Sequence, residues 1–346
     1  MSAILSMDNK STKARRWALI LVNAAIILVI IVVMIGGWTR INDAGLSCPD
    51  WPGCFGQLTV PVSASQLDIA AQLYPDVEVV ASKSWLEMTH RYLAASLALL
   101  ILGLALIAFY LKNEAQYPQL LSFSLLLLVV FQAVLGMWTV TLKLLPIVVT
   151  AHLLGGLLTT VLLVLLRDKI LAINAMSRRW TKANYLLLLG LVLLCLQILL
   201  GGWTSSHYAA WGCSDWLRCN PALDIDYNFS AAFSINLDSS YSHQGGTLAL
   251  AERGAIQITH RVGAVLVISY FLWLYFAVGR HQFWARRCRV LILLIALQIL
   301  LGLMTIAWAV PTLLAMAHHM IAVALLVYTT RVLSVSVLEH KEKLND

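Results

Sequence analysis

Eight uninterrupted apolar stretches constrain this chain more than any other feature of its sequence. Each has about 20 residues, the length that an α-helix needs to cross a bilayer. They are residues 17–38, 86–111, 120–141, 147–166, 185–203, 256–278, 290–309 and 312–333. With 60% hydrophobic and 12% charged residues, the chain is too apolar for a soluble globular protein, and its unbroken runs exclude an outer-membrane barrel. The sequence therefore predicts an all-α integral membrane protein with eight transmembrane helices.

Charged residues predict how these helices are oriented. Lysine and arginine are concentrated before the first stretch, between the fourth and fifth, and between the sixth and seventh. Such basic segments face the cytoplasm. The two long connections, residues 40–85 and 204–255, carry acidic side chains and are expected on the outer face. We therefore predict a multi-pass protein with both termini in the cytoplasm. No feature indicates a nucleic-acid partner.

The second half of the chain repeats the first. Matching motifs occur in the same order in both halves: Gly-Trp-Thr at 37–39 and 202–204, Cys-x5-Cys at 48–54 and 213–219, and Thr-His-Arg at 89–91 and 259–261. Four spans per copy give both copies the same orientation in the membrane. The sequence thus predicts two tandem four-helix bundles related by a parallel internal duplication. These are residues 17–166 and 185–333, with a tail at 1–16, a linker at 167–184 and a tail at 334–346.

Four histidines are expected at one depth in these bundles. His90, His152, His260 and His318 lie within the first two turns of the second, fourth, sixth and eighth spans, which all begin at the outer face. Ionisable residues within spans are costly in lipid and mark a functional site by default. One inward histidine from each of two facing helices is the arrangement that ligates a haem iron through two imidazoles. The alternative for any single histidine is an interhelical hydrogen bond.

Residues beside the histidines support the haem interpretation. The small residues expected to leave room for the macrocycle are Gly155, Gly156, Gly263 and Ala264. Arg91 and Arg261 each follow a histidine toward the outer surface and are placed to meet haem propionates. For both arginines the alternative is that the side chain extends to the lipid headgroups.

Non-haem metal sites fit the pattern less well. A di-iron carboxylate bundle needs Glu-x-x-His twice and further glutamates, whereas the second copy has Gln257 in place of Glu87. Zinc requires a third protein ligand in each half. His319 does not supply it easily, because it points about 100° away from its neighbour His318 around a helix. Haem therefore fits best.

The ordered set of motifs resembles the heme A synthase family. Its elements are Glu-x-x-His-Arg at 87–91, Thr-His-Arg at 259–261, Ala-His at 151–152 and 317–318, and the cysteine pair in the outer loop. Members are membrane enzymes of bacteria and mitochondria that oxidise a methyl group of haem O to the formyl group of haem A. The resemblance implies that one half binds and oxidises haem O while the other holds a haem b that passes electrons.

The resemblance also implies a cellular context. It places the protein in the bacterial inner membrane, where its product serves a terminal cytochrome oxidase and the machinery that assembles it. The farnesyltransferase that makes haem O is the implied partner for delivery of the substrate. The sequence is compatible with a homo-oligomer and identifies no docking surface for a partner.

Glu87 distinguishes the two copies. A carboxylate beside a haem edge takes up a proton or stabilises positive charge during methyl oxidation, and the amide of Gln257 does neither. We therefore predict that His90, His152 and Glu87 form the haem O site and that His260 and His318 ligate haem b. The sequence leaves open whether the oxygen atom comes from dioxygen, after a histidine dissociates, or from water.

The outer loops each contain a cysteine pair. Cys48 and Cys54 lie in the first loop, and Cys213 and Cys219 lie in the second. An oxidising compartment favours disulfides at such positions, so each pair is expected to close its loop. The resemblance implies a redox role for the first pair near the substrate site. Both interpretations stay open.

Three other functional classes compete with the enzyme. A di-haem electron-transfer cytochrome b would use the same four histidines but leaves Glu87 unexplained. A transporter built from parallel repeats would have broken helices and charges near the midplane of the bilayer. A thiol oxidoreductase would need no intramembrane histidines. Heme A synthase is therefore the prediction, and the cytochrome is the alternative.

Overall fold

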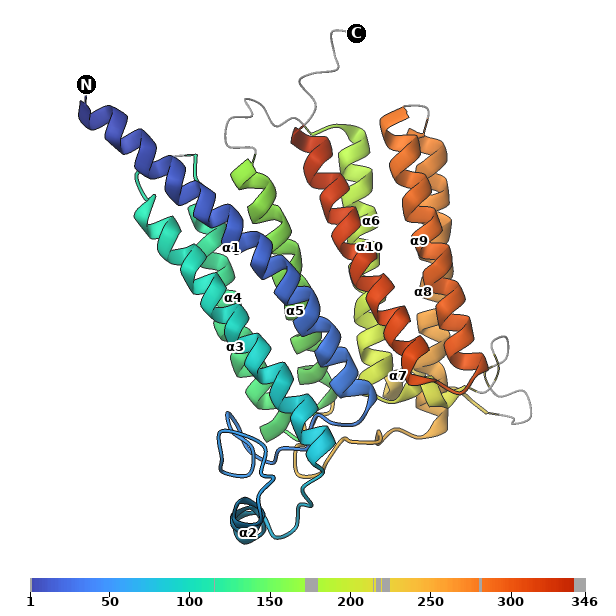
Figure 1. The fold of residues 1–346 in the computed structure, drawn as a ribbon. Helices are drawn as coiled ribbons and strands as arrows, with labels where there is room; N and C mark the ends of the chain where they lie inside the picture. Colours follow the sequence, from blue (N-terminus) through green and yellow to red (C-terminus); the bar gives the residue numbers. More distant parts are fainter. Residues whose placement is uncertain are drawn as a thin grey trace.

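Eight long helices make up most of the chain (Figure 1). The computed structural model describes residues 2–114, 116–171, 180–213, 215, 219, 225–279 and 282–338. The helices long and apolar enough to cross a membrane are α1 (Ser2–Ile41), α3 (Ala81–Tyr110), α4 (Gln119–Thr141), α5 (Pro146–Leu171), α6 (Lys182–Ser206), α8 (Leu250–Val278), α9 (Gln282–Ala307) and α10 (Thr312–Leu338). The prediction of a multi-pass helical membrane protein is confirmed.

Short helices lie in the two long connections between spans. The first connection contains α2 (Ala64–Leu73), which begins at a capping box formed by Ser63 and Gln66. The second contains the 3-10 helix η1 (Ala209–Gly212) and the single turn α7 (Phe229–Ala232). The described residues include isolated β-bridges but no β-strand.

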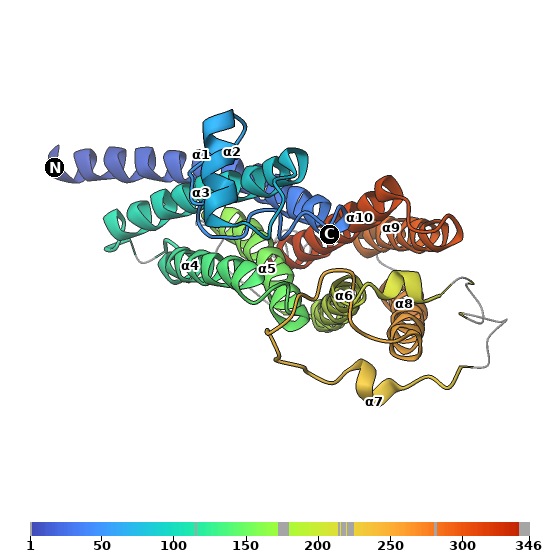
Figure 2. The same ribbon diagram turned by 90° about the horizontal axis from the view of Figure 1, so that it is seen from below.

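The long helices form two groups of four, which Figure 2 shows along the helix axes. In the first group, α3 and α5 lie diagonally and each packs against both α1 and α4. In the second, α8 and α10 lie diagonally and each packs against both α6 and α9. The boundary between the groups is formed where α5 meets α6 and α10, and where α1 meets α10. This equivalent order is compatible with an internal duplication.

Side-chain exposure agrees with a lipid environment. The interiors of the two groups are filled by fully buried apolar residues such as Leu104 and Leu163 in the first and Phe271 and Leu291 in the second. Large apolar residues also cover the outside: Phe276 is 76% exposed in the isolated molecule. Helices that are apolar all round are typical of membrane spans.

Several helices extend beyond the predicted spans. α1 begins at Ser2, so the predicted tail at 2–16 is helical. α5 continues to Leu171 and α10 to Leu338, which shortens the predicted linker and C-terminal tail. Apolar runs underestimate helix length because polar and basic residues continue a helix into the headgroup region. α1 begins and α10 ends at the same end of the molecule (Figure 1); that this end is cytoplasmic stays a prediction.

A buried carboxylate joins the two helix groups at the end opposite the long loops. Asp168 of α5 is 4% exposed and forms an ion pair with Arg331 of α10. Arg167 lies 3.4 Å from the same carboxylate and also donates to Asn23 of α1 at 2.7 Å. Three helices, α1, α5 and α10, therefore meet in one polar cluster.

We expect Asp168→Ala to lower the free energy of unfolding by about 1–3 kcal/mol, because it leaves two arginines without their partly buried partner. The Arg331 side chain is 41% exposed, so solvent screening keeps the loss below that of a fully buried pair. Denaturation of the detergent-solubilised protein measures the change. Glu114→Ala removes the partner of Arg15 in a more exposed pair and is expected to cost about 0–1 kcal/mol. Equal losses in both variants would contradict a special role for Asp168.

Candidate functional site

His90 on α3 and His152 on α5 face each other inside the first helix group. Their ring centroids are 6.3 Å apart and their planes cross at 84°. A metal held at about 2 Å by one nitrogen from each ring separates the ring centres by about 6 Å. The Nδ1 atoms of both rings are buried and form no hydrogen bond within the described residues. The pair therefore fits a single metal atom, such as a haem iron, between the two rings.

Each of the four predicted histidines lies against a glycine of an adjacent helix. A Cβ atom added to the glycine would meet the histidine Cε1 atom at 2.8 Å for Gly36 and His90, 3.4 Å for Gly136 and His152, 3.3 Å for Gly201 and His260, and 3.0 Å for Gly302 and His318. An alanine at Gly36 would push against the imidazole, whereas one at Gly136 would meet it at ordinary contact distance. The four glycines thus allow the rings to lie close to the neighbouring helix in both groups.

These four glycines were not predicted from the sequence, which indicated other glycines as the small residues beside the histidines. Gly155 and Gly263 instead contact glutamine side chains: an added Cβ would lie 1.7 Å from Gln132 and 2.1 Å from Gln197. Both glycines therefore face glutamine side chains, and that they make room for a macrocycle stays a prediction. The available signal was Gln-x3-Gly, which occurs on α4, α6 and α9 and ends each time at a glycine that contacts a histidine.

Glutamines distinguish the second histidine pair from the first. Gln197 donates from Nε2 to His260 Nδ1 at 3.1 Å, and Gln298 donates from Nε2 to His318 Nε2 at 3.1 Å. His318 Nδ1 also donates to the Gln298 carbonyl at 3.0 Å. In this arrangement a glutamine amide donates to a lone pair of each imidazole, and Gln298 contacts both nitrogens of His318.

Within the described residues, no glutamine side chain forms a hydrogen bond to the imidazoles of the first pair. α1 carries Val32 where α6 carries Gln197, one turn before the glycine that contacts the histidine. The buried Nε2 of Gln132 forms no hydrogen bond within the part of the chain that the structure describes. Backbone groups of Val32 and Gln132 do lie within hydrogen-bonding reach of His90 and His152.

Two of the four histidines lie further from the first residue of their helices than predicted. α3 begins at Ala81 and α8 at Leu250, rather than at residues 86 and 256. His90 and His260 therefore lie beyond the first two turns, because a turn has about 3.6 residues. The polar residues that begin both helices continue them outward beyond the apolar run.

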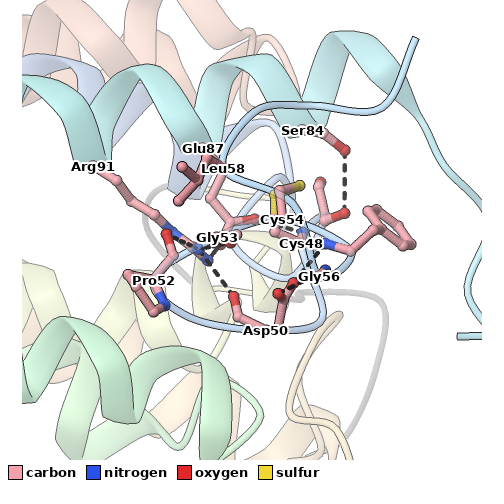
Figure 3. Close-up of a disulfide and its surroundings, with 12 residues drawn as sticks. Cys48, Asp50, Pro52, Gly53, Cys54, Gly56, Leu58, Ser84, Glu87 and Arg91 are labelled. Atoms are coloured by element: carbon pink, nitrogen blue, oxygen red, sulfur yellow. Dashed lines mark hydrogen bonds and ion pairs between the residues drawn. A yellow bond between two sulfur atoms is a disulfide. The ribbon is translucent and has the colours of Figure 1, made fainter. Parts of the chain in front are cut away.

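Glu87 is buried beneath the first outer loop (Figure 3). Its Oε2 atom accepts from the backbone N–H of Cys48 at 2.9 Å, and its Oε1 atom accepts from Arg91 at 2.5 Å. The residue is 4% exposed. One turn earlier on α3, Ser84 donates from its hydroxyl to the Ser47 carbonyl at 3.1 Å. One face of α3 thus binds the loop, and Glu87 is its central contact.

The two arginines predicted to meet haem propionates contact loop backbone. Arg91 donates to the carbonyls of Asp50 at 2.9 Å and Gly53 at 2.5 Å. Arg261 donates to the carbonyl of Asp215 at 2.8 Å. Asp50 and Asp215 are equivalent positions in the repeated motifs. Both arginines therefore hold an outer loop in the same way, and propionate binding stays a prediction.

A disulfide closes each outer loop. Cys48 is bonded to Cys54 and Cys213 to Cys219, as predicted. In the first loop Asp50 accepts from the backbone N–H groups of Phe55 at 2.6 Å and Gly56 at 2.9 Å. The disulfide and this carboxylate together shape the loop that covers Glu87. A redox role for either pair stays a prediction.

A histidine at the outer end of α6 lies outside the membrane-spanning segment. His207 stacks on Trp203, with ring centroids 4.4 Å apart. Burial, together with the nearby His243 and Arg253, lowers the pKa of His207 to about 4. The ring is therefore neutral at physiological pH. Neither His207 nor His243 was predicted as a site residue.

Known proteins are similar to this chain over nearly its whole length. Residues 15–330 match the family model described as cytochrome oxidase assembly protein. The heme A synthase of Shewanella oneidensis is 38% identical over 301 residues, covering 86% of this chain and 90% of that protein. The heme A synthase of Chelativorans sp. is 26% identical over 351 residues, covering 94% and 92%. The family match includes both histidine pairs and both outer loops. The chain therefore belongs to the heme A synthase family.

Proposed function

We propose that this chain is a heme A synthase, which oxidises a methyl group of haem O to the formyl group of haem A. Membership of the family supports this activity. The observation that carries the proposal is the facing pair His90 and His152, whose 6.3 Å ring separation suits one metal atom. Glu87 lies one helical turn away along α3, beneath the outer loop.

The two histidine pairs are proposed to hold different haems. The site that oxidises a substrate needs a group able to accept a proton, whereas a resident electron carrier does not. Glu87 occurs beside the first pair and Gln257 stands at the equivalent position beside the second, which favours His260 and His318 as the ligands of a resident haem b. His90 and His152 are proposed to hold haem O.

Glu87 is proposed to accept a proton during the oxidation. Converting a methyl to a formyl group adds one oxygen atom, from dioxygen or water, and with water as its source releases four protons and four electrons. Haem b would supply a one-electron redox centre that passes electrons between the substrate and an external electron carrier. A carboxylate accepts about four hydrogen bonds, and the donors on Glu87, which are Arg91 and the backbone N–H groups of Cys48 and Ser47, leave capacity for a proton. The outer loop covers Glu87 and limits the access of water to it.

We place the enzyme in the bacterial inner membrane with both termini in the cytoplasm. The basic segments at one end of the molecule support this orientation. Haem A is a product for a terminal oxidase, in line with the family's description as cytochrome oxidase assembly protein. The farnesyltransferase that makes haem O is the proposed source of substrate, because haem O is too apolar to cross water unaided.

The test is the haem content of the purified protein after expression with and without a supply of haem O. Extraction and chromatography identify each haem. Haem b alone without the supply, and haem A or its hydroxylated precursor with it, are the expected results. Haem b under both conditions, with haem O neither bound nor changed, would favour the electron-transfer cytochrome.

The disulfides provide a prediction about how Glu87 is positioned. Replacing both Cys48 and Cys54 by serine is expected to lower turnover at least about tenfold, because the loop that places the Cys48 N–H on Glu87 loosens. The same change at Cys213 and Cys219 is expected to stay within about twofold, since no carboxylate corresponds to Glu87 there. Product formation per bound haem b measures both. Equal losses of turnover in the two double variants would show that the first disulfide does not act through the contact between Cys48 and Glu87.

A further inference from the structure

A fifth intramembrane histidine lies at the boundary between the two helix groups. His319 follows His318 on α10 and points about 100° away from it around the helix. It donates from Nε2 to the carbonyl of Val33 on α1 at 3.3 Å. In a regular helix that carbonyl also accepts from the N–H of Gly37. His319 therefore binds the turn of α1 that contains both glycines of the 36–37 pair.

Consecutive glycines on α1 contact a histidine from each group. A Cβ atom at Gly37 would lie 2.8 Å from His319 Cδ2, and one at Gly36 would lie 2.8 Å from His90 Cε1. The contacts therefore run from His318 to His319 along α10, across to Gly37, and through Gly36 to His90. These contacts connect the two histidine pairs through α1 and α10.

The equivalent boundary contact in the other copy contains no histidine. Leu153 follows His152 as His319 follows His318, and Gly202 corresponds to Gly37. A Cβ atom at Gly202 would lie 3.0 Å from Leu153 Cδ2. A leucine thus suffices to pack α5 against α6 at this position. Since an imidazole is more costly than a leucine within a membrane, packing alone does not account for His319.

We propose that His319 is a positioning residue that couples the two haem sites. By its hydrogen bond to Val33 and its contact with Gly37, it sets the position of α1 and so the place of Gly36 against His90. Occupation of the second histidine pair thereby alters the first pair, and the reverse, because coupling between sites is reciprocal. The inference rests on the proposed function only for the identity of the two haems.

The test compares variants of the detergent-purified protein that contains its haem b. His319→Leu introduces at this position the residue type that the first copy has at the equivalent position, Leu153. His319→Gln retains a hydrogen-bond donor. Gly37→Ala pushes against the imidazole, and Gly202→Ala is the matched control, because the side chain that it meets is the flexible end of Leu153.

Two measurements are made on each variant. The first is the affinity for added haem O, from the change in the absorption spectrum. The second is the midpoint potential of haem b before and after haem O is added. Neither requires turnover.

We expect His319→Leu to keep the full content and low-spin spectrum of haem b. Its affinity for haem O is expected to fall about tenfold, and the effect of haem O on the haem b potential is expected to disappear. His319→Gln should retain most of both effects. Gly37→Ala should lower the haem O affinity and abolish the potential shift in the same way. The double variant should lose little more than His319→Leu alone, because both substitutions disrupt the same contact between Gly37 and His319. Gly202→Ala should resemble the wild type.

Two results would overturn the coupling. One is an unchanged haem O affinity and an unchanged potential shift in His319→Leu. The other is a parallel loss of haem b and haem O in His319→Leu, His319→Gln and Gly37→Ala, which indicates a packing role. Failure of the proposed function gives a different result, in which wild-type protein binds haem O but releases it unmodified.

Discussion

Glu87→Gln is expected to abolish the oxidation of haem O and leave the spectrum of haem b intact. Removal of a general acid or base typically costs about 10²–10⁴-fold in rate. The glutamine amide has nearly the same volume, and its oxygen is still able to accept from the Cys48 N–H, so the loop stays in place. The second copy carries a glutamine at this position, which shows that the helix accommodates it. Product formed per haem b, after extraction and chromatography, measures the change.

Ser84→Ala is the matched control for that experiment. It removes another contact between α3 and the same loop, the hydrogen bond to Ser47, and leaves the carboxylate in place. Turnover is expected to stay within about threefold of wild type, since one neutral hydrogen bond contributes about 1 kcal/mol. A comparable loss in both variants would assign the effect of Glu87→Gln to loop position, and full activity of Glu87→Gln would refute the assignment of the two halves.

The second large effect is expected at the ligands of haem b. His260→Ala or His318→Ala should each remove the low-spin haem b signal, because bis-histidine coordination requires both imidazoles. Loss of a supporting residue alone typically costs 10–100-fold in metal affinity, so loss of a ligand is expected to exceed about 100-fold. Absorption spectra of the reduced protein at equal concentrations measure the loss.

His152→Ala provides the comparison within the first pair. It should keep the haem b signal and lose the capacity to bind haem O, since His90 alone remains there. Retention of the low-spin signal in both His260→Ala and His318→Ala would show that the resident haem lies elsewhere. Loss of that signal in His152→Ala would reverse the roles of the two helix groups.

The number of spans and the proximity of His90 to His152 were predictable from sequence for physical reasons. Each span must bury about 20 residues in lipid, and this length requirement leaves a continuous apolar run. The duplication placed His90 and His260 at matching positions, so each supported the interpretation of the other. Helix ends were less predictable, because no apolar pattern marks where α1 and α3 begin outside the bilayer.

Contacts between segments far apart in the sequence could not be predicted in the same way. That Glu87 accepts from Cys48 depends on how the outer loop folds over α3, and no local pattern specifies this. That His319 meets α1 depends on the rotation of α10 and on the packing of the two groups. The Gln-x3-Gly motif was visible, but only the packed helices show which glycine contacts a histidine and which contacts a glutamine.

The first outer loop binds Ser84, Glu87 and Arg91 and so covers one face of α3 at the loop end of the first bundle. A substrate with a long farnesyl chain is then expected to reach His90 and His152 sideways, from within the lipid, through a gap between neighbouring helices. The reaction centre would thus exchange haems with the bilayer and protons with the outer loop, along two separate routes. The fraction of haem O that partitions into the membrane, rather than its concentration in water, would set how fast the site fills.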